Sequence, residues 1–342
     1  MTQPCAVPER SNTPAVADLA CLLCGPRAFA WVSEATDKHF RGHGRFSFWR
    51  CTGCGLVVLH PRPSVEVMGQ YYPDYVTPVA SGGTFRQRLK RLVAEDWYGY
   101  EPEARALLWP VRLLRKALTL PLRPFLNQVP RRRLGGKVLD VGCGSGGSLA
   151  FLARLGWTCY GIEPGPRSRT YAQDVLGLTV HQGPLESCGF PDSFFDVVTM
   201  WHVVEHLANP PATLREIHRV LKPDGVLVLR TPNVDSWEAR CFQGNWYGLD
   251  PPRHFFLFSP GTIRAMLERS GFMMTRLRYQ YHPTDSSRSL LYVFEDKGFS
   301  HVHRFVARWI RYIELGLVAC SPMRRVFGQG GAMHVEARKA SS

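Results

Sequence analysis

Residues 138–147 constrain the fold of this 342-residue chain more than any other segment. They read VLDVGCGSGG: an apolar run ends in an acid, glycines then alternate, and an amphipathic stretch follows at residues 148–155. This order predicts a strand, a tight turn and the start of a helix, because glycine adopts backbone conformations that other residues avoid and lets a ligand approach the backbone closely. Gly142, Gly144 and Gly147 also satisfy the G-x-G-x-x-G pattern of dinucleotide-binding turns, so the glycines alone leave the ligand open.

Further motifs follow this segment in a fixed order. Residues 157–163 read WTCYGIE, a second strand pattern that ends in an acid. Residues 194–207 read FFDVVTMWHVVEHL, and residues 214–229 read LREIHRVLKPDGVLVL. Across residues 135–280, this succession resembles the class I S-adenosylmethionine (SAM) methyltransferases. The resemblance implies an enzyme that transfers a methyl group from SAM.

Cysteines are paired at C-x-x-C spacing at Cys21/Cys24 and at Cys51/Cys54. The expected fold is therefore α/β: a Rossmann-like, doubly wound seven-stranded sheet with a small N-terminal zinc ribbon and inserted amphipathic helices. The expected strands are residues 137–141, 157–163, 179–182, 195–200, 226–231, 273–281 and 333–338. The resemblance implies that the last strand enters the sheet antiparallel, after a turn at residues 328–331.

Four domains are expected along the chain. They are a disordered N-terminus (1–20), a four-cysteine zinc-ribbon module (21–80), a basic amphipathic helical linker (81–134) and the methyltransferase domain (135–342). Residues 285–327 are expected to form an inserted helical segment within the last domain, and this segment is a candidate substrate lid.

The resemblance also implies roles for residues around the glycine turn. Glu163 is expected to hold the two ribose hydroxyls of SAM, and residues 142–146 its methionine portion. Asp140 is expected either to orient this loop or to bind the methionine amino group. Glu186 lies near the expected adenine position, although Gly183-Pro184 stands where the family usually has Gly-Asp. The expected cofactor-binding residues are Asp140, Gly142, Gly144, Gly146, Glu163, Glu186 and Trp201.

Four further side chains are candidates for catalysis at the methyl acceptor. If residues 202–206 are helical, His202, Glu205 and His206 share one face just after the fourth strand. His206 is then a candidate general base oriented by Glu205, or the group could bind a divalent ion, as a similar E-x-x-E-H does in some ubiquinone-type O-methyltransferases. The alternative is that these residues only cap and pack the segment. His254, in a P-R-H loop, could line the acceptor pocket or brace its own loop.

Cys21, Cys24, Cys51 and Cys54 form two C-x-x-C-G knuckles. Two such thiolate pairs complete a tetrahedral zinc site, and the glycine after each pair lets the chain turn tightly. A redox pair or disulfides are the alternatives, but a redox motif does not need a second copy, and ten cysteines without a recognisable export signal indicate a reducing compartment. We expect a closed structural Zn²⁺ site that folds a small ribbon and takes no part in the chemistry.

The formal net charge of +14 is concentrated in two segments. Lys and Arg exceed Asp and Glu by 9 in residues 82–137 and by 6 in residues 276–342, whereas residues 138–275 carry a net charge of −2. Both basic segments have apolar residues at helical spacing. In the second, Phe305, Val306, Trp309, Ile310 and Ile313 lie opposite Arg304, Arg308 and Arg311. Such helices suit an anionic membrane surface, or they dock their apolar stripe on the core and leave the arginines in solvent.

The sequence therefore predicts a SAM-dependent methyltransferase with a small-molecule or lipid-linked acceptor. A sugar of a polysaccharide or secondary-metabolite pathway is the expected acceptor, because the four-cysteine ribbon is similar to that of bacterial methyltransferases of such pathways. The expected location is the cytoplasm, with peripheral contact at the inner face of the cell membrane. This expectation rests on the absence of a recognisable secretory signal and of a run of about eighteen apolar residues.

Two other functions remain alternatives. A basic chain with a zinc ribbon would suit an RNA methyltransferase, but MWHV at residues 200–203 replaces the Asp/Asn-Pro-Pro-Tyr/Phe motif of base amino-methyltransferases. Aromatic and basic residues also do not alternate as they do in RNA-binding strands. A non-catalytic zinc-ribbon scaffold is the alternative outside the enzymes, and the intact Asp140, Glu163 and glycines argue against it.

Overall fold

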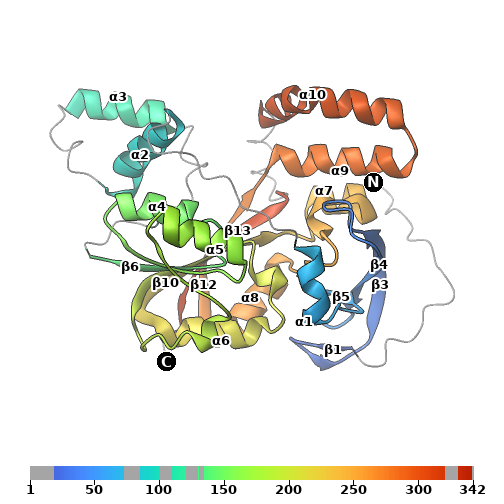
Figure 1. The fold of residues 1–342 in the computed structure, drawn as a ribbon, viewed down its shortest axis with the longest axis horizontal. Coiled ribbons are helices and arrows are strands. Elements are labelled where there is room, and N and C mark those ends of the chain that lie inside the picture. Colours follow the sequence, from blue (N-terminus) through green and yellow to red (C-terminus); the bar gives the residue numbers. More distant parts are fainter. Residues whose placement is uncertain are drawn as a thin grey trace, which may run out of the picture. The chain divides into compact units, whose positions relative to one another are not determined.

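The computed structural model describes residues 19–72, 85–100, 109–120, 130, 135–319 and 330–340 (Figure 1). The chain forms two compact units. Unit 1 comprises the described residues within 1–71, 232–265 and 281–331, and unit 2 comprises those within 72–231, 266–280 and 332–342. Each unit is therefore assembled from segments that are far apart in the sequence. The expected division into four domains stays a prediction, and most of its first part, residues 1–18, lies outside the described residues.

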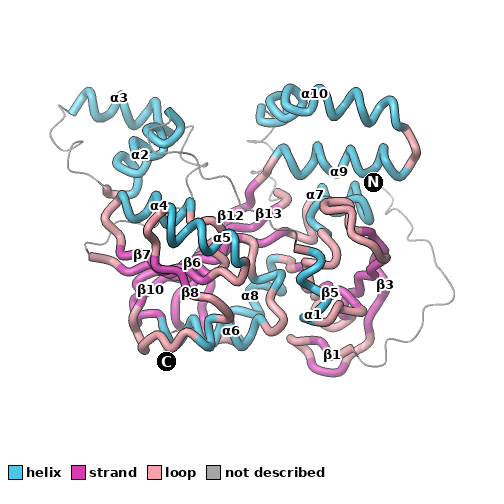
Figure 2. The backbone as a smooth tube through the Cα atoms, in the orientation of Figure 1, coloured by secondary structure: helices cyan, strands magenta, loops and turns pink. Residues whose placement is uncertain are grey.

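Unit 2 contains a seven-stranded sheet with the strand order β12-β13-β10-β9-β6-β7-β8 (Figure 2). The strands are β6 (Lys137–Val141), β7 (Thr158–Ile162), β8 (Thr179–His181), β9 (Phe195–Trp201), β10 (Leu221–Pro232), β12 (Phe272–Gln280) and β13 (Ala332–Lys339). Strands β6 to β10 pair in parallel, whereas β13 runs antiparallel to β12. The expected fold class is confirmed, with β10 beginning at Leu221 instead of residue 226.

Two helices of unit 2 precede its strands along the chain, and three lie between the strands. They are α2 (Phe85–Tyr98), α3 (Trp109–Thr119), α4 (Gly147–Arg154), α5 (Pro166–Thr170) and α6 (Pro210–Val220), with a π-helical turn at Tyr171–Val175 and 3-10 turns at Leu185–Ser187 and Val204–His206. Leu149 and Leu152 of α4 lie in one buried cluster with Val138 of β6 and with Val93 and Ala94 of α2. Helix α2 is thereby fixed to the helix that follows the glycine turn.

Unit 1 contains a two-stranded sheet and a four-stranded antiparallel sheet with the order β11-β5-β4-β3. The strands are β1 (Ala20–Cys21), β2 (Gly25–Pro26), β3 (Phe29–Thr36), β4 (Arg45–Cys51), β5 (Val57–His60) and β11 (Phe256–Leu257). The helices are α1 (Val65–Met68), α7 (Trp237–Phe242), α9 (Pro283–Asp296) and α10 (Ser300–Ala319), with 3-10 turns at Gly69–Tyr71, Gln243–Asn245 and Tyr247–Leu249. Helix α8 (Pro260–Arg269) contains residues of both units.

A buried ion pair joins the early and late segments of unit 1. The guanidinium of Arg253 donates to both carboxylate oxygens of Asp37, at 2.7 and 2.9 Å, and its Nε donates to Asp250 at 2.9 Å. The Asp37 side chain is fully buried, and the Arg253 side chain is 2% exposed. Removing one partner of such a pair leaves the other charge buried and uncompensated, which costs about 3–5 kcal/mol. This pair, which the sequence did not reveal, therefore holds the P-R-H loop against the N-terminal sheet.

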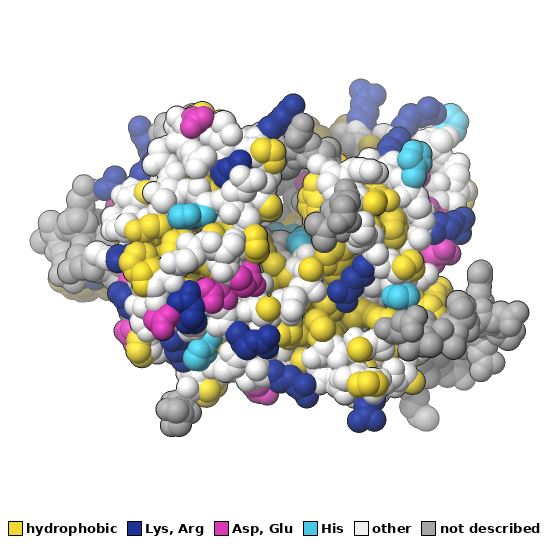
Figure 3. All heavy atoms as spheres, turned by 60° about the horizontal axis from the view of Figure 1, so that its bottom comes forward, with side chains coloured by type: hydrophobic (Ala, Val, Ile, Leu, Met, Phe, Trp, Pro, Cys, Tyr) yellow, Lys and Arg dark blue, Asp and Glu magenta, His cyan; other side chains and the backbone are white. Residues whose placement is uncertain are grey.

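Helix α10 buries only part of the apolar stripe that the sequence predicted for it. The helix packs against α9, with Val306 buried and Ile310 half-buried, whereas Phe305 is 64% exposed and Trp309 is also exposed. Arg304 and Arg308 are exposed, and the side chains of Arg311 and Ile313 lie outside the described part. Among the described helices, none combines the length and apolarity needed to cross a bilayer. On the face drawn in Figure 3, Lys and Arg side chains are dispersed and do not form one continuous patch.

Candidate functional site

The glycine turn of unit 2 has the backbone shape that the sequence predicted. Gly142, Gly144 and Gly146 have φ values of 70°, 55° and 78°, a region that other residues adopt at a cost. A Cβ at Gly142 would lie 2.6 Å from Val203 Cγ2, and a Cβ at Gly146 would lie 2.5 Å from Leu178 Cδ1. The packing of the loop therefore requires these two glycines, in addition to any requirement of a ligand.

Glu163, at the end of β7, holds this loop from the side. Its Oε2 accepts a hydrogen bond from Gly144 N–H at 2.8 Å, and its Oε1 accepts one from Gly165 N–H at 2.7 Å. Burial raises the pKa of Glu163, although both backbone bonds oppose this shift by favouring the charged form. Each carboxylate oxygen has a second lone pair, so the expected bonds to ribose hydroxyls are compatible with this arrangement.

Asp140 lies within the sheet below the loop. It is buried, and its Oδ1 accepts a hydrogen bond from Thr199 Oγ1 of β9 at 2.6 Å. Burial raises the pKa of Asp140 to about 7, because charging a carboxyl group in an apolar surrounding is costly. The two roles expected for this residue both stay predictions, and its hydrogen bond to Thr199 ties the loop to the neighbouring strand.

Ser145 is a loop residue that the sequence analysis did not single out. The side chain is buried, yet its Oγ has no hydrogen-bond partner among the described residues. A buried hydroxyl normally has a partner, because leaving it unpaired costs about 1–3 kcal/mol. The loop therefore combines an unpaired hydroxyl with left-handed glycines and a neighbouring carboxylate, which fits a polar cofactor. The visible signal in the sequence was a polar residue within the glycine motif.

Glu186 and Trp201, the last two residues expected to bind the cofactor, have partners within unit 2. Glu186 follows β8, and its Oε1 accepts a hydrogen bond from Thr213 Oγ1 of α6 at 2.8 Å. Trp201, the last residue of β9, stacks on His334 with ring centroids 5.9 Å apart, and the Arg230 guanidinium lies 5.6 Å from its ring. Their expected roles toward SAM stay predictions.

Residues 202–206 do not form the helix on which their expected alignment depended. Only Val204–His206 is helical, as a single 3-10 turn, and His202 has a left-handed φ of 57°. His202 Nδ1 lies 3.1 Å from Oε1 of the fully buried Glu205, whereas His206 Nδ1 lies 3.1 Å from the hydroxyl of Tyr72. Glu205 thus contacts His202, and Tyr72 contacts His206, whereas the expected pairing of Glu205 with His206 stays a prediction. A carboxylate that holds Nδ1–H fixes the imidazole tautomer whose Nε2 can accept a proton.

His254 is a buried residue of unit 1. Its Nδ1 lies 2.8 Å from the carbonyl oxygen of Gly248, six residues earlier in the same loop. This contact is the one expected of a histidine that braces its loop, and its role toward an acceptor stays a prediction.

The four cysteines of the two knuckles lie together in unit 1. Their sulfur atoms are all within 4.8 Å of one another, and Cys21 Sγ lies 3.5 Å from Cys54 Sγ. Zinc–sulfur bonds of about 2.3 Å in a tetrahedron place sulfurs about 3.8 Å apart, so this donor set fits one Zn²⁺. Leu23 N–H also donates to Cys21 Sγ, a bond that stabilises a thiolate ligand.

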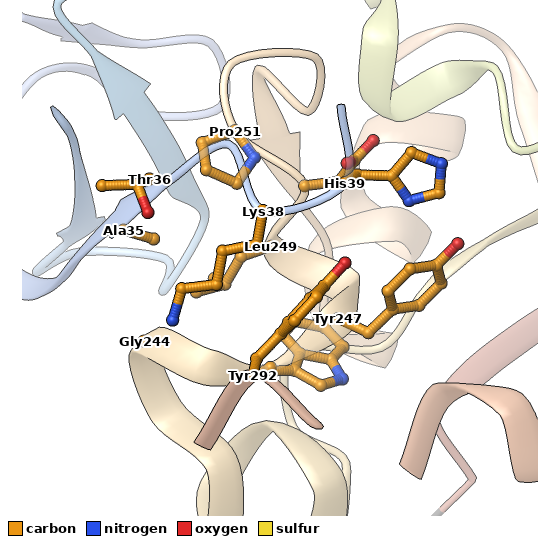
Figure 4. Close-up of a pocket in the computed structure, with 11 residues that line it drawn as sticks. Ala35, Thr36, Lys38, His39, Gly244, Tyr247, Leu249, Pro251 and Tyr292 are labelled. Carbon is orange, nitrogen blue, oxygen red and sulfur yellow. The ribbon is translucent and has the colours of Figure 1, made fainter. Parts of the chain in front are cut away.

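A hollow in unit 1 is lined by aromatic side chains and by Lys38. It encloses about 240 Å³, counting space open to solvent, and Lys38, His39, Tyr247 and Tyr292 lie around it (Figure 4). Lys38 Nζ lies 5.7 Å from the centre of the Tyr292 ring and forms an ion pair with Asp296 at 2.6 Å. Burial lowers the pKa of His39 and raises that of Tyr247 to about 12, so both are neutral at pH 7. The sequence did not indicate this hollow, because its residues come from three distant segments.

Comparisons with known proteins agree with the geometry of unit 2. Residues 113–277 match the family described as methyltransferase domain. The chain is 30% identical over 154 residues to the ubiquinone biosynthesis O-methyltransferase of Azorhizobium caulinodans, covering 42% of this chain and 61% of that protein. It is 34% identical over 135 residues to the enzyme of the same name from Actinobacillus pleuropneumoniae serotype 5b, covering 36% and 56%. The chain thus spans little more than half the length of these two relatives.

A solved S-adenosylmethionine-dependent methyltransferase from Mesorhizobium loti is also similar. It is 18% identical, with a TM-score of 0.43 and coverage of 65% of this chain and 98% of that chain. The family match and the loop geometry agree: residues 113–277 are similar to the methyltransferase-domain family, and they contain the glycine loop of unit 2.

Proposed function

We propose that the chain transfers a methyl group from SAM to an oxygen of a small-molecule acceptor. The observation that carries this proposal is the glycine loop, in which Glu163 and the unpaired Ser145 hydroxyl lie next to three left-handed glycines. Oxygen is the proposed target because both relatives described above are named O-methyltransferases.

The residues of the loop would bind SAM through separate groups. Glu163 accepts the ribose hydroxyls with the lone pairs that its bonds to Gly144 and Gly165 leave over. The first turn of α4, which follows Gly146, presents backbone N–H groups that suit the methionine carboxylate. When bound, SAM supplies an electrophilic methyl group for in-line displacement, so the protein chiefly positions the acceptor and removes its proton.

His202 is the proposed general base. Glu205 holds its Nδ1 at 3.1 Å, which leaves Nε2 free to take the proton of an acceptor hydroxyl. His202 is also the accessible member of the pair, because its side chain is 41% exposed and that of Glu205 is fully buried. The expected role of His206 as a base oriented by Glu205 stays a prediction beside this assignment.

The acceptor itself is proposed to be lipid-linked and to carry a sugar, at the cytoplasmic face of the membrane. The exposed Phe305 and Trp309 of α10 lie on the same helix as the exposed Arg304 and Arg308, a combination that suits an anionic lipid surface. In unit 1, the four-cysteine cluster is proposed to hold one structural Zn²⁺ that stabilises the N-terminal strands.

Calorimetry with S-adenosylhomocysteine (SAH) tests cofactor binding. We expect stoichiometric binding that weakens at least tenfold in Glu163→Ala, because each charge-assisted hydrogen bond contributes about 1.5–3 kcal/mol. Glu268→Ala, which removes an exposed carboxylate of the same unit, is the control and should leave the affinity unchanged. Tight binding of NAD without binding of SAH would contradict the proposal.

Radiolabelled SAM then tests the acceptor. Incubation with free sugar nucleotides, an extracted lipid-linked fraction and total RNA should label the lipid-linked fraction, and His202→Gln should reduce the rate by at least tenfold. Label that appears only in RNA would replace the proposed acceptor and leave the proposed cofactor intact.

A further inference from the structure

Helix α3 packs with its charged face inward. Arg115 Nε donates to Oδ1 of Asp96 at 2.8 Å, and Arg115 Nη1 lies 3.6 Å from Glu95 Oε2. Thr119 Oγ1 donates to Asp96 Oδ2 at 3.0 Å and accepts from Trp97 Nε1 at 3.1 Å. The Asp96 side chain is fully buried under these contacts. The polar face of α3 is thus fixed to α2 by hydrogen bonds and ion pairs.

The opposite face of α3 is apolar and exposed. Trp109 is 73% exposed, Leu114 62% and Leu118 69%, and Val111, Leu113 and Leu120 are exposed as well. At 100° per residue, these side chains and Ala117 cover an arc of about 200°. Amphipathic helices of water-soluble units normally bury this face, so the orientation of α3 is the reverse of the usual one. No described side chain covers this arc.

We propose that the apolar face of α3 inserts into the surface of a lipid bilayer that contains anionic headgroups. Three features favour lipid. Trp109 lies at the first position of the helix, where an indole suits the headgroup region. Lys116 borders one edge of the apolar arc, Arg112 lies on the polar face behind it, both are half-buried, and residues 109–120 contain no Asp or Glu. Basic residues beside an apolar face are the arrangement that attracts anionic lipid.

The size of the face argues against a second copy of the chain. An 11-residue helix is about 16 Å long and about 10 Å wide. A stable protein interface buries about 800 Å² on each partner, which is several times the area of such a strip. A bilayer imposes no such minimum, because a single amphipathic helix can lie in its surface with the apolar face immersed by about 5–10 Å.

The path from α3 to the cofactor loop is short. Helix α2, which holds α3, shares a buried cluster with Leu149 and Leu152 of α4, and α4 begins directly after the glycine loop. Adsorption through α3 would therefore hold unit 2 and its loop at the membrane surface. The biological role of this membrane contact rests on the proposed function, in which the acceptor is lipid-linked. The contact itself can be measured without any methyl transfer.

Vesicle co-sedimentation of the full chain tests the inference. The probe is vesicles of phosphatidylcholine with 30% phosphatidylglycerol, compared with pure phosphatidylcholine, at about 0.1 M and about 1 M salt. Leu114→Ser with Leu118→Ser should weaken binding by roughly tenfold or more for each leucine, because a buried leucine contributes strongly to the transfer into an apolar phase. Val175→Ser removes an equally exposed apolar side chain of unit 2 and should have no effect.

Thermal unfolding, SAH calorimetry and sedimentation velocity of the same variants separate the outcomes. Loss of vesicle binding with unchanged melting temperature and SAH affinity supports insertion. A lowered melting temperature would mean that the chain itself covers the face, and a change from dimer to monomer without lipid would assign it to a second copy; either result overturns the inference. Normal vesicle binding by the double variant does the same. If the unsubstituted chain does not bind SAH, the proposed function is overturned, but the inference about lipid binding is not.

Discussion

The cysteine cluster of unit 1 and the glycine loop of unit 2 both contain left-handed glycines, but they depend on them differently. At Gly25, after the first knuckle, an added Cβ meets nothing within 4 Å, and at Gly55 it meets only a terminal atom of Arg50 at 3.9 Å. At Gly142 and Gly146, an added Cβ would approach other side chains within 2.6 Å. The knuckles use glycine to set the direction of a turn, whereas the loop also uses it to leave space.

This difference predicts how each site fails. The cysteine cluster binds through four side-chain sulfurs, so it should fail when a sulfur is removed and should tolerate an added methyl group nearby. The glycine loop presents its backbone, so one methyl group should distort it. The three predictions below test this contrast, beginning with the largest effect.

Replacing a ligand should abolish the metal site. Cys51→Ser should lose bound zinc and the order of β3 to β5, because metal binding contributes about 10–16 kcal/mol to structural zinc sites of this kind. Elemental analysis and hydrogen exchange measure both effects. Cys241→Ser, at an exposed cysteine outside the cluster, is the matched control and should retain one zinc per chain. Substoichiometric metal in the reduced, unsubstituted protein would refute the zinc assignment.

Adding one methyl group should separate the two kinds of glycine. Gly25→Ala should cost about 1–2 kcal/mol, the strain of a left-handed alanine. Gly142→Ala should cost about 1–3 kcal/mol more, because the methyl group also meets Val203, and it should weaken SAH binding. Urea denaturation and calorimetry compare the variants. Equal costs at the two positions would show that both glycines serve only the turn.

The buried carboxyl group below the loop should make stability depend on pH. The folded pKa of Asp140 is about 7, above the ordinary value of 3.8, so the folded state binds the proton more tightly than the unfolded state. Its stabilising effect is complete below pH 3.8 and is lost as the pH rises through 7. Between pH 5 and pH 8 the free energy of unfolding of the unsubstituted chain should fall by about 2–3 kcal/mol, whereas that of Asp140→Asn should not show this fall. Parallel melting curves at the two pH values for both proteins are the measurement, and identical pH dependence would contradict it.

The sequence predicted those features that depend on local pattern. The parallel strands of unit 2 were visible because most of them contain a short apolar run next to a turn, and the glycine loop was visible because its backbone shape requires particular residues. The clustering of Cys21, Cys24, Cys51 and Cys54 followed from paired spacing. These features needed no knowledge of which distant segments meet.

Other features depend on contacts between distant segments and could not be read from the chain. Helix α3 has the pattern of a helix that buries its leucines. However, Asp96 and Glu95 of α2 bind its Arg115, so the polar face of α3 points inward and its leucines are exposed. The 3-10 turn at Val204–His206 interrupted the expected helix because His202 leaves β9 in a left-handed conformation. Tyr72 carries no pattern that distinguishes it from an ordinary surface residue, and Ser145 is marked only by its polarity within the glycine motif.

The ion pair between Asp37 and Arg253 has a consequence for the order of folding during synthesis. The two residues are 216 positions apart. A ribosome that adds about 5–20 residues per second needs roughly 10 to 40 s to produce the second after the first. During that interval the nascent N-terminal sheet has neither strand β11 nor the guanidinium that neutralises its buried acid. The N-terminal segment can therefore reach its final state only after most of the polypeptide has left the ribosome.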